Sequence, residues 1–343
     1  TKKNQIIRMK KMEKLKKRLS TLKLDNIPLI KNIILQGTVI LISFLFGGIS
    51  FAGGISPFAT GFAAGIHSKY LISSAVGAAA GYAVFFGIFD SLRFVAAVCF
   101  IMLFRLGFEE RLYKHRMLFC VLTAIITSFI SSLAVFFAVG HNSTYLITCF
   151  CEALISGAFS CFTLRISEVN ALRKKGAYFA PTDIISTVFF GCILLLSLER
   201  LSVFGFSPAR FIAYLAIMTF ALCGKESASS LAGICSAVTL GFNEEHPQLM
   251  LSYILTGLIT GLTGVYGKIP VALSLIVASV LSLILKGSAE TALIAITEAA
   301  LSGIVFVILP QRLLSSLMNT VFPLTRDTFS EEKGRSLKFI LKR

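Results

Sequence analysis

Long apolar stretches separated by short polar or basic turns cover most of the chain between residues 33 and 309. A helix that crosses a membrane needs about 20 predominantly apolar residues. The pattern therefore predicts an all-α, polytopic transmembrane helical bundle. Twelve apolar blocks can be distinguished: Ile33–Ala52, Ile55–Ile66, Tyr70–Phe89, Phe94–Leu106, Met117–Val139, Tyr145–Leu164, Ile184–Phe204, Phe211–Cys223, Ser227–Phe242, Leu249–Val265, Ile269–Leu285 and Thr291–Leu309.

Four of these blocks fall below the lower limit of about 17 residues for a full crossing. They are Ile55–Ile66, Phe94–Leu106, Phe211–Cys223 and Ser227–Phe242. Half-helices or re-entrant segments buried inside the bundle would explain such lengths. We therefore expect about ten spans, in an even number that leaves both ends of the chain on one side.

Basic residues indicate which side that is. Ten lysines and arginines fall within the first 23 residues, and the loops Arg105–Arg116 and Arg165–Lys175 are also basic. An even number of blocks separates these regions, so all of them can face the cytoplasm, as the positive-inside rule requires. We therefore predict a multi-pass protein with both termini cytoplasmic. Four cations oppose the rule: Arg93, Arg200, Arg210 and Lys286.

The composition agrees with a membrane protein, since 55% of the residues are hydrophobic and 15% are charged. The net charge of +16 does not indicate nucleic-acid binding, because much of it is concentrated at the N-terminus. Residues 1–30 are predicted to form a basic amphipathic segment on the inner leaflet, attracted to anionic lipid headgroups. A solvated charged tail is the alternative. The apolar positions behind this prediction are Met9, Met12, Leu15, Leu19 and Leu22.

Two stretches 146 positions apart read alike, Glu152–Gly157 and Glu298–Gly303. Each lies on the last apolar block of its half, which divides the membrane domain into residues 33–165 and 184–312. With six blocks in each half, the two copies would have the same orientation, as in a parallel internal repeat. The alternative is a chance match among small residues that are common in membrane helices.

Glu152 and Glu298 are the acids that lie well inside apolar blocks, and Ser156 and Ser302 follow on the same helical faces. Because an acid at membrane depth costs about 2.5–3.5 kcal/mol, it usually faces the bundle interior. These four residues predict a symmetric intramembrane polar centre that binds a proton, a cation or a small solute. The other interpretation, which we favour, is interhelical hydrogen bonding that fixes packing.

Small residues four positions apart predict helices that approach closely, within the chain or between chains in self-association. These residues are Gly61, Gly65, Gly77, Gly81, Gly257 and Gly261.

The sequence shows no clear set of catalytic residues. The sequence holds no phosphate-binding loop, no nucleophile elbow and no zinc-protease motif, the four histidines are isolated, and the eight cysteines lie in or beside apolar blocks. The pairs Asp90/Arg93 and Lys225/Glu226 are interpreted as charges at the span boundaries. We therefore predict no catalytic, metal or cofactor residue, and a membrane-embedded enzyme ranks last.

Several short motifs, in this order and spacing, resemble the N-terminal membrane region of stage II sporulation protein E from endospore-forming bacteria. The match covers nearly the whole chain but is strongest between Gly224 and Arg312. The residues that carry it are Pro57-Phe58, Glu152, the run Gly257–Leu262, Gly267-Lys268, Lys286–Ala289, Glu298 and Leu309–Gln311.

The resemblance implies about ten spans in a bacterial cytoplasmic membrane, then an oligomerising region and a manganese-dependent serine/threonine phosphatase domain of the PP2C type. In that family the phosphatase acts on a phosphorylated anti-anti-sigma factor and so activates the first forespore sigma factor at the asymmetric sporulation septum. The region between is associated with the tubulin-like cell-division protein.

Applied to this chain, the resemblance predicts a membrane-anchoring and localisation domain at residues 31–312, preceded by the basic segment 1–30. Residues 313–343 are expected to be a cytoplasmic linker towards a C-terminal domain that this sequence does not include, so any manganese belongs to that domain. The alternative function is a small-solute or ion transporter built from parallel repeats.

Overall fold

The computed structural model describes residues 32–51, 54–109, 115–139, 143–173, 181–201, 206–241, 249–286 and 289–314. Within these ranges all regular elements are helical, which confirms the predicted all-α class. The predicted basic segment 1–30 lies outside the described residues, as does the predicted linker after residue 314.

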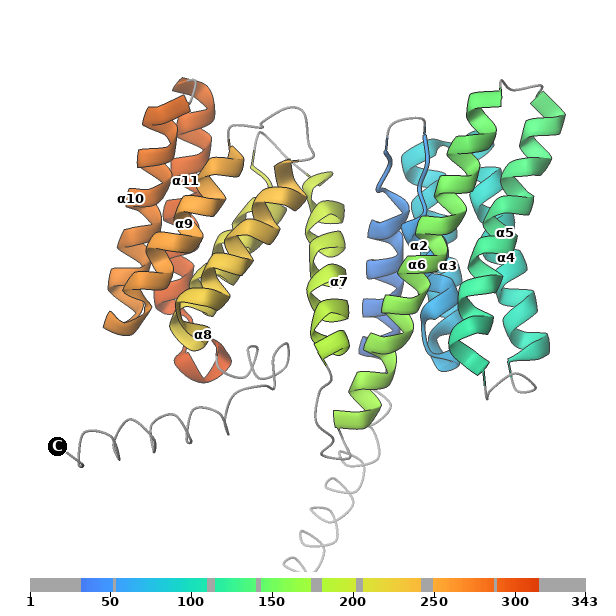
Figure 1. Cartoon of the computed structure of the whole chain (residues 1–343), viewed down its shortest axis with the longest axis horizontal. Coiled ribbons are helices and arrows are strands. Elements are labelled where there is room, and N and C mark those ends of the chain that lie inside the picture. The colour runs from blue at the N-terminus through green and yellow to red at the C-terminus, as the bar shows by residue number, and fades with distance from the viewer. Residues whose placement is uncertain are drawn as a thin grey trace, which may run out of the picture.

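The helices form two bundles side by side (Figure 1). The first contains the helix Asn32–Gly47, then α2 (Phe58–Gly65), η1 (Ser68–Tyr70), α3 (Leu71–Phe86), α4 (Ile88–Phe108), α5 (Arg116–Val139) and α6 (Ser143–Arg173). The second contains α7 (Pro181–Glu199), α8 (Pro208–Gly241), α9 (Leu249–Thr263), η3 (Gly264–Tyr266), α10 (Lys268–Lys286) and α11 (Ala289–Ile308).

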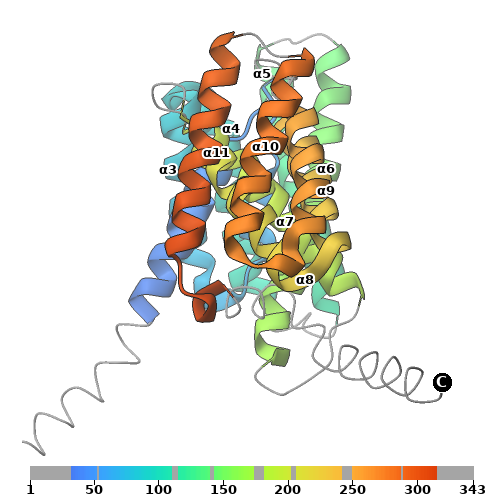
Figure 2. The same ribbon diagram turned by 90° about the vertical axis from the view of Figure 1, so that its left-hand side faces the viewer.

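Six helical segments of the described chain are long and apolar enough to cross a membrane: Ser68–Phe86, Ile88–Phe108, Arg116–Ala138, Ser143–Glu168, Thr182–Glu199 and Leu249–Tyr266. Four shorter apolar helices accompany them: Asn32–Gly47, Pro208–Cys223, Lys268–Leu281 and Ala295–Ile308. The axes of most of the long helices are roughly aligned with one another, as a membrane bundle requires (Figure 2). The protein is thus a helical membrane bundle.

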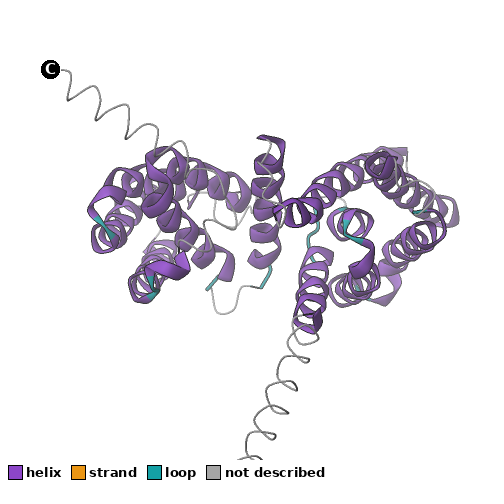
Figure 3. Cartoon of the chain, turned by 90° about the horizontal axis from the view of Figure 1, so that it is seen from below, coloured by secondary structure: helices purple, strands orange, loops and turns teal. Residues whose placement is uncertain are grey.

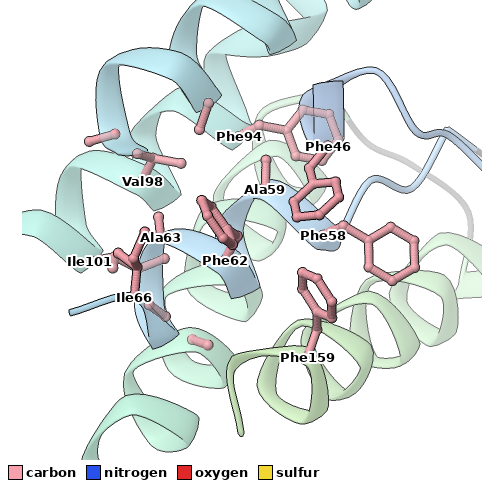
Figure 4. Close-up of a cluster of buried hydrophobic side chains, with 14 of the residues drawn as sticks. Phe46, Phe58, Ala59, Phe62, Ala63, Ile66, Phe94, Val98, Ile101 and Phe159 are labelled. Atoms are coloured by element: carbon pink, nitrogen blue, oxygen red, sulfur yellow. The ribbon is translucent and has the colours of Figure 1, made fainter. Parts of the chain in front are cut away.

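Each bundle has its own apolar core. The first is rich in phenylalanine: the rings of Phe46 and Phe58 meet Phe159 of α6 there, and the ring of Phe62 meets Phe46 (Figure 4). Phe46 and Phe58 contact Phe159 edge to face, at centroid distances of 5.4 and 5.2 Å, a geometry that the ring quadrupole favours. Helix α7 lies between the bundles in the view along the helices (Figure 3), and its two faces contact the two cores, with Ile193 in the first and Leu195 against the second.

The short block Ile55–Ile66 becomes α2, a helix of eight residues that are all buried. At about 1.5 Å per residue, α2 is about 12 Å long and too short to cross a bilayer. It is a half-helix inside the first bundle, and irregular backbone at such a depth is tolerated only where the surrounding protein satisfies it.

The two short blocks Phe211–Cys223 and Ser227–Phe242 form one helical element, α8, which folds back on itself. The Ser229 hydroxyl donates a hydrogen bond to the Ile217 carbonyl at 3.3 Å. In a straight helix, two residues twelve positions apart would be separated by about 18 Å. The two blocks are therefore the arms of a hairpin (Figure 1).

The prediction that Phe94–Leu106 is a shortened block was wrong. It belongs to α4, a helix of 21 residues that begins at Ile88. The apolar run looked short because Asp90 and Arg93 interrupt it near its start, and Arg93 turns out to be an internal side chain. Only 10% of that side chain is exposed, so its charge is buried within the protein.

The six predicted packing glycines lie against a neighbouring helix of the same chain. Gly61 and Gly65 of α2 face the carbonyls of Ser156 and Ser160 on α6, so closely that an added Cβ would collide with them. Gly77 and Gly81 face the helix Asn32–Gly47 in the same way, and Gly257 and Gly261 face the second arm of α8. These faces are thus occupied within the chain.

Candidate intramembrane ion-pair centres

Glu152 reaches from α6 to the start of the half-helix α2. Its side chain is 3% exposed, and Oε1 accepts a hydrogen bond from the backbone N–H of Ser56 at 2.9 Å. Ser56 and Pro57 directly precede α2, where backbone N–H groups have no partner inside the helix and the helix dipole favours a negative charge. The carboxylate therefore stabilises the buried N-terminus of α2.

Glu298 does the same in the second bundle. From α11, its Oε1 accepts a hydrogen bond from the backbone N–H of Ser207 at 2.8 Å. Ser207 directly precedes Pro208, the first residue of α8. In each half, a glutamate on the last helix thus binds the amide of a Ser-Pro pair that begins the second helical element. This common geometry supports the internal repeat beyond the likeness of the two short stretches.

Each carboxylate also has an arginine partner, but the two arginines come from different places. Arg93 of α4 lies 3.8 Å from Glu152, and Arg210 in the first turn of α8 lies 3.2 Å from Glu298. Arg93 also donates to the Tyr145 hydroxyl at 2.6 Å. Two of the four cations that oppose the positive-inside rule are therefore buried partners of the intramembrane acids.

The predicted serines lie on the expected faces but do not contact the carboxylates. Ser156 pairs with the hydroxyl of Thr60 at 3.0 Å, and Ser302 donates to the Ala299 carbonyl of its own helix at 2.9 Å. The groups that do bind the acids are the Ser-Pro amides and the two arginines. The Ser-Pro pairs and the exceptional position of the arginines were the signals in the sequence that could have found them.

The C-terminal end of α2 is held by a second charged cluster. The Arg105 guanidinium donates to the carbonyls of Ala63 at 3.1 Å and Ile66 at 2.6 Å, and it also binds Glu109 at 2.9 Å. The side chain of Arg105 is fully buried. A cation is favoured at the C-terminal end of a helix, so α2 has a carboxylate at one end and a guanidinium at the other.

Glu109, directly after α4, joins this cluster to two further residues. It accepts a hydrogen bond from the Ser68 hydroxyl at 2.6 Å and forms an ion pair with Arg116 at 3.1 Å. Burial acts to raise the pKa of Glu109, but the hydrogen bonds from Ser68 and Arg105 and the charge of Arg105 outweigh it and hold the pKa below the ordinary value. The carboxylate is therefore ionised at neutral pH.

Among the described residues, no group of three or more histidine, cysteine, aspartate or glutamate side chains could hold a metal ion. The arrangement is one of buried ion pairs at helix ends. Comparison with known proteins gives one match: the family model described as SpoIIE, N-terminal domain, matches residues 1–318. No curated protein and no solved structure matches the chain.

Proposed function

The chain belongs to the SpoIIE N-terminal domain family, and we propose that it anchors, localises and assembles a SpoIIE-like serine/threonine phosphatase in the membrane. The match over residues 1–318 carries this proposal, because it includes the whole of the membrane bundle. In this proposal the phosphatase domain follows the bundle on the cytoplasmic side, acts on a phosphorylated anti-anti-sigma factor and requires manganese.

The distribution of side chains supports an anchoring role. Large apolar residues such as Phe89, Ile72 and Val84 are exposed on the outside of the bundle, whereas both intramembrane glutamates and Arg105 are buried. A soluble protein would not expose so many apolar side chains. Lipid is the environment that suits this surface, and the basic segment 1–30 adds attraction to anionic headgroups.

The positions of the first and last helices of the described chain suit a cytoplasmic attachment. The helix Asn32–Gly47 begins, and α11 ends, at the same end of the molecule (Figure 2). The C-terminal end of α6, at Arg173, and the start of α7 lie at that end too (Figure 1). In our proposal this end is cytoplasmic, next to the attached phosphatase and the tubulin-like cell-division protein.

Replacing the membrane bundle in the full-length protein tests this function. In sporulating cells, a fluorescent full-length protein should accumulate at the asymmetric septum. A version with residues 1–318 exchanged for an unrelated polytopic anchor should remain in the membrane but spread around the cell. Septal accumulation of the exchanged protein would refute a localising role.

A second candidate function is ion or small-solute transport. It is favoured by one observation, the repeated placement of a buried glutamate at a helix N-terminus in two similarly oriented halves. Proteoliposomes that contain the protein should then show a flux that Glu152→Gln or Glu298→Gln abolishes. Absence of flux with the unmodified protein would remove this candidate.

A further inference from the structure

Two cysteines face each other where α7 meets the second arm of α8. The thiols of Cys192 and Cys235 lie within hydrogen-bonding reach of one another, and the Thr239 hydroxyl, one turn further along α8, also reaches Cys192. Both cysteines are partly exposed, and both are free thiols. Two sulfur atoms that meet across two helices, on side chains directed at each other, have the arrangement from which a disulfide forms.

This contact distinguishes the pair from other cysteines of the described chain. The Cys149 thiol is bonded to the hydroxyls of Tyr145 and Ser132. Cys223 lies on the first arm of α8 with a similar partial exposure, but burial alone acts on its thiol. A single cysteine in an apolar helix serves as a small hydrophobic side chain, whereas two facing thiols form a dithiol that can be oxidised.

Both members of the pair lie at a similar depth. Cys192 is seven residues before the end of α7 at Glu199, and Cys235 is six residues before the end of α8 at Gly241. At about 1.5 Å per residue, the two positions are about 9–11 Å from the ends of their helices. Our predicted topology places those ends on the outer side of the membrane, away from the cytoplasmic systems that keep thiols reduced. A lipid-soluble reagent is the kind that reaches this depth.

Helix α7 is fastened to the first half along its length. Near its start, the Thr182 hydroxyl accepts a hydrogen bond from Arg165 of α6 at 3.0 Å. In its middle, Phe190 packs against the first core. Directly after its end, Arg200 donates a hydrogen bond to the Ser50 hydroxyl. The position of α7 is therefore set by the first half, although the chain continues from it into the second.

Toward the second half, α7 contributes the apolar side chains of Leu195 and Leu198, which pack against the second core. The Cys192 thiol meets α8 in the same contact. A covalent bond at this position would hold α7 to the second half as firmly as its other contacts hold it to the first.

We propose that Cys192 and Cys235 are a redox pair, which a lipid-soluble quinone oxidises to a disulfide that joins α7 to the second arm of α8. Each thiol gives up one proton and one electron as the sulfur–sulfur bond forms, and the quinone takes up both protons and both electrons to become a hydroquinone. Membrane quinones accept the electrons of disulfide formation on the outer side of the bacterial membrane. The disulfide connects the second half to a helix that is already fastened to the first, so the two halves become one rigid unit.

Oxidation can be measured on the full chain, reduced beforehand and reconstituted in lipid vesicles. Decylubiquinone is the probe, because its ring has no free position for a thiol to add to. Of the eight cysteines, we expect the quinone to consume two thiols per chain, and peptide mapping should find Cys192 linked to Cys235. Dithiothreitol should restore both thiols. The midpoint of thermal unfolding should rise by several degrees on oxidation, because a disulfide restricts the unfolded chain.

Variants identify the thiols that react. Cys192→Ser should abolish both the loss of thiols and the rise of the unfolding midpoint. Cys235→Ala, which introduces no polar group, should do the same. The matched control is Cys223→Ser, which removes a thiol of similar exposure from the same helical element and should still lose two thiols to the quinone.

Three results would overturn the proposal. One is an unchanged thiol count after exposure of the unmodified protein to the quinone. Another is a loss of two thiols that persists in Cys192→Ser, which would assign the reaction to other cysteines. The third is a disulfide that leaves the unfolding midpoint unchanged, which would exclude a clamp between the halves. None of these results depends on where the protein localises, so failure here is distinct from failure of the anchoring function.

Discussion

Removal of the Arg105 side chain tests whether the half-helix α2 depends on its charged ends. The variant Arg105→Leu places an apolar side chain of moderate size in a fully buried position. It removes the donors to the carbonyls of Ala63 and Ile66, and it leaves Glu109 with Arg116 as its remaining cation. Two buried carbonyls and part of a buried ion pair lose their partner at once.

The expected loss follows from these contacts. A hydrogen bond to a charged group contributes about 1.5–3 kcal/mol, and removal of one partner from a buried ion pair costs about 3–5 kcal/mol. These contributions overlap, so we expect Arg105→Leu to reduce the free energy of unfolding by about 3–5 kcal/mol. Arg105→Lys should reduce the free energy of unfolding by less than Arg105→Leu does. Lysine keeps the charge but lacks the planar fork that reaches two carbonyls and a carboxylate.

Chemical unfolding of the purified chain in mild detergent, followed by circular dichroism, measures this loss. Its pH dependence gives a second readout. The pKa of Glu109 is held below its ordinary value, so its stabilising contribution is present above the unfolded-state value of 4.5 and is lost as the pH falls through the lower folded value. The acid-dependent loss of stability should be smaller in Arg105→Leu than in the unmodified protein. A loss below about 1 kcal/mol at pH 7, in the range of a surface pair, would refute the reasoning.

Three further predictions concern packing, charge and topology. Gly81→Ala should destabilise the protein by about 1–3 kcal/mol through overpacking, whereas Gly191→Ala, with open space around it, should not; equal effects in unfolding assays would contradict the close packing. Glu152→Gln should destabilise more than Glu152→Gln combined with Arg93→Gln, because the single change leaves a buried cation without its acid; additive losses in a double-mutant cycle would exclude coupling. Reporter fusions at Lys69 and Lys225 should show a cytoplasmic location. Fusions at Asn142 and Lys286 should show a location outside the cell.

Apolar runs alone predicted the helical class and the buried half-helix, because length and hydropathy are local properties. Block Ile55–Ile66 was too short to cross a membrane and became α2. Reading span length from the apolar run failed for Phe94–Leu106, because a charged residue such as Arg93 ends an apolar run wherever its side chain lies in the fold. In the fold, Arg93 has a buried acid and a tyrosine hydroxyl to bind, so α4 can begin before it.

Prediction of the site was partial for a related reason. Glu152 and Glu298 stand out because an acid in an apolar block is costly wherever it lies. Their partners do not stand out, because Ser56 and Glu152 are 96 positions apart and Ser207 and Glu298 are 91 positions apart. Helical spacing suggested Ser156 and Ser302 instead, since residues four apart share a face, but a shared face does not require a shared hydrogen bond.

The two arginines show what the repeat has kept. Both halves keep the carboxylate and the Ser-Pro amide, yet the balancing cation comes from α4 in one half and from the first turn of α8 in the other. The two halves therefore share a charge pair at a buried helix N-terminus, but they differ in the helix that supplies the arginine of that pair.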